Sequence, residues 1–164
     1  MKTKHTRGLL FFFLMSVIVA CNSKNADQPA AAVIDTAQVK QEIQAKEDEF
    51  AAVYNAREMK DIGYYADDAT SFAQNSPALV GKPAIVEYLK ANIDSASTGK
   101  KLSCKTNEVF VSNDGNQVVE TGYYTMVDSA GSILNSGNYM TLFVKRDGKY
   151  YSLRDMSVTD MQDK

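Results

Sequence analysis

Apolar residues recur at helical spacing where the first regular pattern of the chain begins. Asp35 and Thr36 stand just before them, and both are residue types that cap the start of a helix. The pattern predicts a long amphipathic helix from Thr36 to about Arg57, with the charged run at 47–49 on its solvated side. The apolar positions behind this prediction are Val39, Ile43, Phe50, Val53 and Tyr54.

Two shorter helices are expected to follow. Residues 61–65 can form the first, and the segment at 65–70, which reads YADDAT, would end it. Asp67 and Asp68 in this segment are adjacent, so their side chains point in different directions, and we expect capping or solvation rather than a catalytic pair. Pro83 is suited to the first turn of the other helix. The apolar face of that helix would carry Ile85, Leu89 and Ile93.

The second half of the chain changes to stretches rich in Val, Tyr, Phe and Thr, which are typical of β-strands. Short segments of Asn, Asp, Gly and Ser separate these stretches and have the chemistry of hairpin turns. Helices first and strands afterwards predict an α+β domain with helices packed on one face of a curved antiparallel sheet. The predicted strands are 102–112, 117–128, 133–146 and 149–159.

The N-terminus has a different pattern. The basic residues Lys2, Lys4 and Arg7 precede an apolar run at 9–19, which is about half of the roughly 20 residues that span a bilayer. Followed by Ile-Val-Ala-Cys ending at Cys21, this segment resembles a bacterial lipoprotein signal with its lipobox. The alternative is an ordinary secretory signal with a chance cysteine.

The lipoprotein resemblance implies that residues 1–20 are a removable signal and that Cys21 becomes the lipidated first residue of the mature chain. Residues 21–34 then form a flexible tether and residues 35–164 the folded domain. We expect a membrane anchor through the lipid on Cys21, in the cell envelope. Because Asn22 is not the aspartate that favours inner-membrane retention in enteric bacteria, we expect the outer membrane, facing the periplasm.

Loss of the signal would limit the available chemistry, because the one histidine of the chain is His5. A mature chain without histidine excludes imidazole metal sites and Ser-His-Asp or Cys-His catalysis, and we expect neither metal nor cofactor. Cys104 would be a small buried hydrophobic residue rather than a nucleophile. With 15 basic and 20 acidic residues, the mature chain carries a formal charge of −5. Such an acidic surface does not favour nucleic-acid binding.

The order of certain segments resembles the NTF2-like superfamily, especially its SnoaL-like and DUF4440-type members. The resemblance covers residues 33–159. It implies a cone in which a bent antiparallel sheet wraps on a long N-terminal helix, with two shorter helices and an apolar cavity open at one end. It also implies a homodimer formed through the sheet. The segments that carry it are Tyr65–Thr70, Gly81–Ile85, Gly137–Tyr139 and Asp147–Asp155.

The positions that match the catalytic residues of the ketosteroid-isomerase branch carry other residue types in this chain. The position of the general base is Ala73, the oxyanion tyrosine of the first helix matches Phe50, and the second oxyanion donor falls near Met140 or Thr141. The limonene-epoxide-hydrolase type needs an Asp-Arg-Asp arrangement. The adjacent residues Arg154 and Asp155 match one part of this arrangement. Proton abstraction by the usual route of this family is therefore not expected.

Tyrosines on the elements that bound the family's cavity predict a site for a small apolar or aromatic ligand with one or two polar groups. The alternative is that most of them fill the core or a dimer interface. The weak catalytic candidates are Asp155 and Glu120. If the strand face of Glu120 lines the cavity, apolar surroundings would raise the pKa of this carboxyl group and make it a candidate acid or base. We favour the alternative, in which this face points outward and Glu120 is solvated. The predicted ligand-binding residues are Phe50, Tyr54, Tyr65, Phe72, Tyr123, Tyr139, Arg154 and Asp155.

Three functions remain open at this point. The leading hypothesis is a lipid-anchored envelope protein that binds a small, mostly apolar ligand or a protein partner without catalysis. The second is a SnoaL-like isomerase, dehydratase or hydrolase that acts on a small cyclic substrate through Asp155, Glu120 and a tyrosine. The third is an interaction module that uses its sheet face to dock on another envelope protein.

Overall fold

The computed structural model describes residues 34–95 and 99–161, and the predicted signal, Cys21 and most of the tether lie outside this part of the chain. Helix α1 spans Thr36–Ala56, 21 residues. The Asp35 side chain accepts hydrogen bonds from the backbone N–H groups of Ala37 and Gln38, which satisfies two free donors at the start of the helix. The helix ends at Arg57, whose left-handed backbone (φ 62°) turns the chain away.

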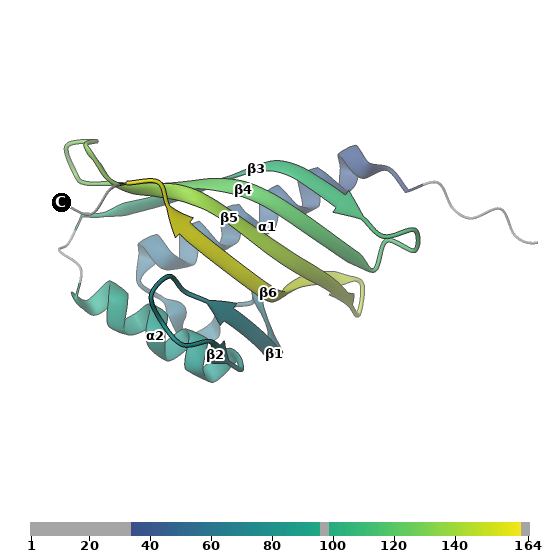
Figure 1. Cartoon of the computed structure of the whole chain (residues 1–164), viewed down its shortest axis with the longest axis horizontal. Helices are drawn as coiled ribbons and strands as arrows, with labels where there is room; N and C mark the ends of the chain where they lie inside the picture. Colours follow the sequence, from purple (N-terminus) through teal and green to yellow (C-terminus); the bar gives the residue numbers. More distant parts are fainter. Residues whose placement is uncertain (1–33, 96–98, 162–164) are drawn as a thin grey trace, which may run out of the picture. The chain divides into compact units, whose positions relative to one another are not determined.

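Six strands form one curved sheet in the order β2-β1-β6-β5-β4-β3 (Figure 1). The predicted four-strand meander is confirmed, because β6 to β3 pair as antiparallel neighbours. The prediction of a purely antiparallel sheet is wrong, since β1 pairs in parallel with β6. The strands are β1 (Tyr65–Phe72), β2 (Leu79–Val80), β3 (Lys101–Val111), β4 (Gln117–Val127), β5 (Ile133–Arg146) and β6 (Lys149–Thr159).

The segment YADDAT is a strand and not the end of a second helix, which corrects the prediction. A three-residue 3₁₀ turn, η1 (Met59–Asp61), ends at the residue where that helix was expected to begin. The strand forms because Tyr65 and Ala69 bury their side chains in the core while the backbone of β1 pairs with β6. The solvated position expected for the Asp67 and Asp68 pair is found, and Asp68 forms an exposed ion pair with Arg146 at 2.8 Å.

Helix α2 spans Lys82–Ser95 and begins with Pro83 in its first turn, as predicted. Gly81 precedes it with a positive φ of 85°, which only glycine adopts without strain. The helix lies against β1, with Ile85 and Ile93 fully buried. No helix among the described residues is long and apolar enough to cross a membrane.

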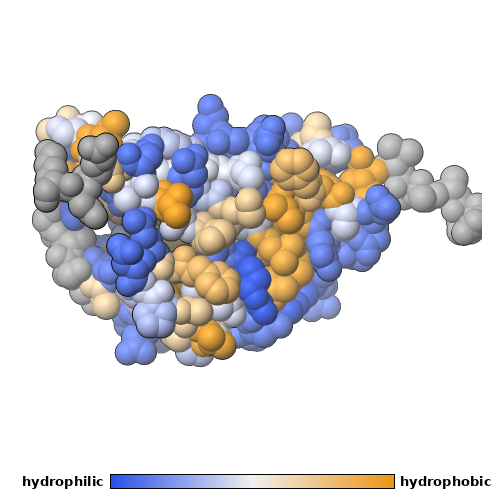
Figure 2. All heavy atoms as spheres, in the orientation of Figure 1, coloured by the Kyte–Doolittle hydropathy of each residue, from blue (hydrophilic) through white to orange (hydrophobic). Residues whose placement is uncertain are grey.

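Both helices cover the concave side of the sheet, α1 against β3 and α2 against β1 (Figure 1). The core between them is centred on Ile43 of α1, Val118 of β4 and Phe143 of β5, all fully buried. The opposite face of the sheet is exposed and mixes polar with apolar side chains (Figure 2). Phe72, Met156 and Met140 are register neighbours on β1, β6 and β5 and are about half exposed.

Candidate functional site

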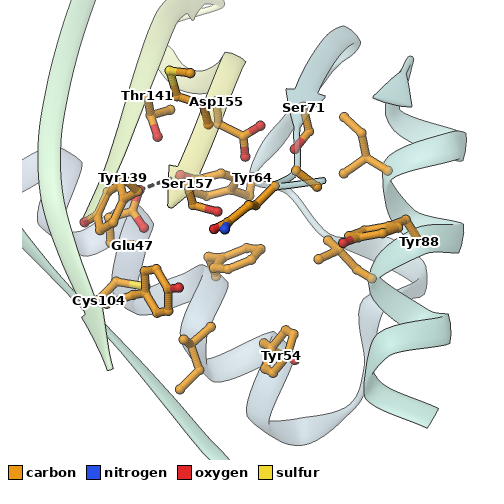
Figure 3. Close-up of a pocket in the computed structure, with 18 of the residues that line it drawn as sticks. Glu47, Tyr54, Tyr64, Ser71, Tyr88, Cys104, Tyr139, Thr141, Asp155 and Ser157 are labelled. Carbon is orange, nitrogen blue, oxygen red and sulfur yellow. Dashed lines mark hydrogen bonds between the residues drawn. The ribbon is translucent and has the colours of Figure 1, made fainter. Parts of the chain in front are cut away.

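A cavity of about 320 Å³ lies between the two helices and the concave face of the sheet (Figure 3). Aromatic side chains form much of its wall. Tyr88 reaches in from α2 on the side opposite Tyr139 and Cys104 (Figure 3). Phe50, Tyr64 and Tyr65 pack together, with ring centroids 4.9–6.2 Å apart. Such a wall suits a ligand with a flat apolar body.

The structure brings together five of the eight residues predicted to bind a ligand. Phe50 and Tyr54 reach the cavity from α1, Tyr65 from β1, Tyr139 from β5 and Asp155 from β6. These residues are far apart in the sequence, and the cavity exists because β1 and β6 run side by side.

Phe72, Tyr123 and Arg154 are not among the residues that line this cavity. Phe72 is 46% exposed. The Tyr123 hydroxyl donates to Asp160 at 2.8 Å, and Arg154 donates to the carbonyl of Asp68 at 3.1 Å. The cause is strand alternation: each of the three is followed or preceded by a residue that does face inward.

Glu120 is fully buried, which corrects the expectation that it points outward. Its Oε1 oxygen accepts hydrogen bonds from Thr106 (2.6 Å) and from the Tyr139 hydroxyl (3.0 Å). Burial raises the pKa of Glu120, and these hydrogen bonds partly offset the rise. The apolar neighbour Val118 on the same strand face is also fully buried, so the whole face is turned toward the helices.

Glu47 is a further buried carboxyl group, and its predicted position on the solvated side of α1 is wrong. It is 2% exposed and accepts a 2.5 Å hydrogen bond from the Tyr64 hydroxyl. Burial and the neighbouring Glu120 raise the pKa of Glu47 well above its usual range. The sequence spacing does indicate burial, because Glu47 continues the i, i+4 series of the buried residues Val39 and Ile43 on α1.

Asp155 is the third carboxyl group of the site and reaches into the cavity from β6 (Figure 3). Its Oδ2 oxygen accepts a 3.2 Å hydrogen bond from the Tyr65 hydroxyl. Burial raises the pKa of Asp155, while its strand neighbour Ser71 and Tyr65 lower it. Two weakly acidic carboxyl groups therefore line the cavity and a third, Glu120, lies behind them, and each accepts a hydrogen bond from a tyrosine hydroxyl.

The isomerase-like positions also line the cavity, but they carry no acid or base. Ala73, Phe50 and Thr141 are all in its wall, and the carboxyl groups come from other positions. Cys104 lines it too, and burial, with Glu47 and Glu120 nearby, raises the pKa of its thiol, which opposes a nucleophilic role. No group of three or more potential metal ligands occurs among the residues that the structure describes.

Comparison with solved structures shows a cystatin-like, NTF2-like fold. A Nostoc punctiforme protein with a cystatin-like fold matches with a TM-score of 0.66 and 18% identity, over 76% of this chain and 93% of that one. An NTF2-like protein from Novosphingobium aromaticivorans matches with a TM-score of 0.61 and 8% identity, over 77% and 85%. A putative scytalone dehydratase from the same organism gives 0.62 and 17%, over 77% and 88%. No family profile and no curated sequence matches the chain.

Proposed function

We propose that this protein is a lipid-anchored NTF2-like domain of the cell envelope that binds a small, mostly apolar ligand in the cavity between its helices and sheet. The single observation that carries the proposal is that cavity, whose tyrosine-rich wall and about 320 Å³ volume suit one ring system with polar substituents. Solved proteins of the same fold include a putative dehydratase of a small molecule, scytalone, which supports a small-molecule role for this fold.

A substitution at the cavity mouth tests this proposal. Ser157 lines the cavity and is exposed, so Ser157→Phe is expected to place a ring in the opening. A clash of about 1–3 kcal/mol corresponds to about 5- to 150-fold weaker ligand binding. Native mass spectrometry of the purified domain, compared with its denatured mass, measures a ligand carried from the cell. Ser103→Phe, at an exposed position on the same sheet outside the cavity wall, is the matched control.

A second candidate is acid–base catalysis, favoured by the buried carboxyl of Asp155 at the cavity wall beside the Tyr65 hydroxyl. The ligand recovered in the same experiment separates the two functions. A ligand that returns unchanged after incubation with the protein supports binding alone. Its conversion to an isomer or a dehydration product supports an enzyme.

The lipid anchor is tested at Cys21. Cys21→Ser is expected to move the protein from the membrane fraction to the soluble fraction, because a single serine cannot accept the thioether-linked lipid. Metabolic labelling with an alkyne fatty acid and cell fractionation measure both effects. Label on the Cys21→Ser variant, or an unlabelled natural protein, would contradict the anchor.

A further inference from the structure

The cavity is acidic, and the described residues of its wall include no positively charged side chain. The carboxyl groups of Glu47 and Asp155 line it, and Glu120 lies behind them, bonded to Tyr139. No lysine, arginine or histidine is among the lining residues. Within the described part of the chain, the ion pairs involve other side chains. Burial disfavours the ionised form of these carboxyl groups and a cation beside them restores it, so the cavity favours a positively charged partner.

Two buried carboxyl oxygens lack a hydrogen-bond donor among the described residues: Glu120 Oε2 and Asp155 Oδ1. Glu120 raises the pKa of the neighbouring Glu47, so a proton kept by this pair of carboxyl groups supplies a donor on that side. Asp155 accepts from Tyr65 through its other oxygen and points into the cavity (Figure 3). Asp155 Oδ1 is therefore the acceptor that a ligand can use.

The aromatic wall adds a second requirement. The hydroxyl groups of Tyr64, Tyr65 and Tyr139 each donate to a carboxyl group already, so none of them is free to donate to Asp155 Oδ1. Their rings remain available, and the face of an aromatic ring attracts a cation. A neutral alcohol could donate to Asp155 but would not stabilise its ionised form, whereas an ammonium group supplies both the donor and the charge that stabilises the carboxylate.

We propose that the cavity selects a protonated amine carried on a flat apolar ring, with the ammonium group at Asp155 and the ring among the aromatic side chains of α1 and α2. This inference rests on the proposed small-molecule function and adds the chemical class of the ligand. Geometry carries it: the acidic wall, the free acceptor and the aromatic faces converge on one cavity.

Tryptamine and its neutral analogue tryptophol test the inference. They share the indole ring and differ in an amine or a hydroxyl group. The chain contains no tryptophan, so indole fluorescence or its anisotropy, excited at a wavelength that tyrosine does not absorb, reports the bound probe. We expect tryptamine to bind at least about tenfold more tightly at neutral pH, because its hydrogen bond to a carboxylate is charge-assisted.

The variant Asp155→Asn keeps the side-chain volume and removes the charge, and it is expected to abolish the preference for tryptamine. Glu108→Gln removes the same charge from an exposed position on β3 and is expected to keep it. Equal affinity of the natural protein for both probes overturns the inference and leaves the proposed function standing. Absence of binding of either probe to the folded protein counts against both. A preference that persists in Asp155→Asn overturns the assignment of the ammonium group to Asp155.

Discussion

The free energy of unfolding is expected to fall as the pH rises from about 5 to about 8, which makes the domain most stable under mildly acidic conditions. The cause is the burial of Glu47, which raises its pKa well above the ordinary glutamate value of 4.5. In the unfolded chain this carboxyl loses its proton near its ordinary pKa. In the folded domain it keeps the proton to higher pH, so deprotonation pulls the equilibrium toward the unfolded chain.

The linkage relation gives the size of the effect. Each carboxyl group that is protonated only in the folded state lowers the free energy of unfolding by about 1.4 kcal/mol per pH unit. Glu120 and Asp155, whose pKa values are also raised, act in the same direction. Asp68 and Asp160 have lowered pKa values, so their stabilising contribution is lost only in more acidic solution, below this window.

Glu47→Gln tests this prediction, because glutamine keeps the shape and an acceptor for Tyr64 but cannot ionise. Its free energy of unfolding is expected to fall less steeply with pH, so that its advantage over the natural protein grows toward pH 8. Guanidinium unfolding at a series of pH values measures the slope. Glu108→Gln, at an exposed position, should follow the natural protein. An unchanged slope in Glu47→Gln would show that Glu47 is not the group that holds the proton.

Gly137→Ala is expected to lower the free energy of unfolding by about 3 kcal/mol. Gly137 is buried on β5, where an added Cβ would overlap the carbonyl oxygen of Val158 on β6. That oxygen belongs to the backbone, so the overlap is relieved only if the two paired strands move apart. The Tyr124 ring closes the other approach at 2.9 Å from the added atom.

Chemical denaturation of the Gly137→Ala domain measures this loss. Asn138→Ala is the control, since Asn138 is the next residue on the same strand and is exposed. Its effect is expected to stay within about 0.5 kcal/mol. If Gly137→Ala were as stable as the control, the close pairing of β5 and β6 at this position would be wrong.

The strands of the second half could be predicted because strong turn residues bound them, and hairpin turns act locally. The strand at Tyr65–Phe72 could not. Its Asp67 and Asp68 are poor strand formers, and its partner β6 lies about 80 residues further along the chain, where no local signal reaches. Tertiary pairing and the burial of Tyr65 decide its conformation.

The residues of the site could be predicted only in part, because side chains alternate between the two faces of a strand. Once one residue of an adjacent pair faces inward, its neighbour faces outward, but the sequence does not say which. Asp155 and Arg154 illustrate this, as do Tyr124 and Tyr123. Glu47 was missed for a different reason: its charge suggested a solvated position, whereas the periodicity of the buried face of α1 pointed inward. A charged residue that falls on the buried face of a helix by its spacing is therefore a candidate buried functional group.

The parallel pairing of β1 with β6 also determines when the cavity can form. Ser71 and Asp155 are register partners, yet one belongs to the first strand of the domain and the other to the last. The β3–β5 meander needs only local contacts, but the Tyr65–Asp155 contact must wait until β6 has been synthesised and docked. The cavity is thus a property of the completed chain, because its walls meet only when the first and the last strand of the domain pair.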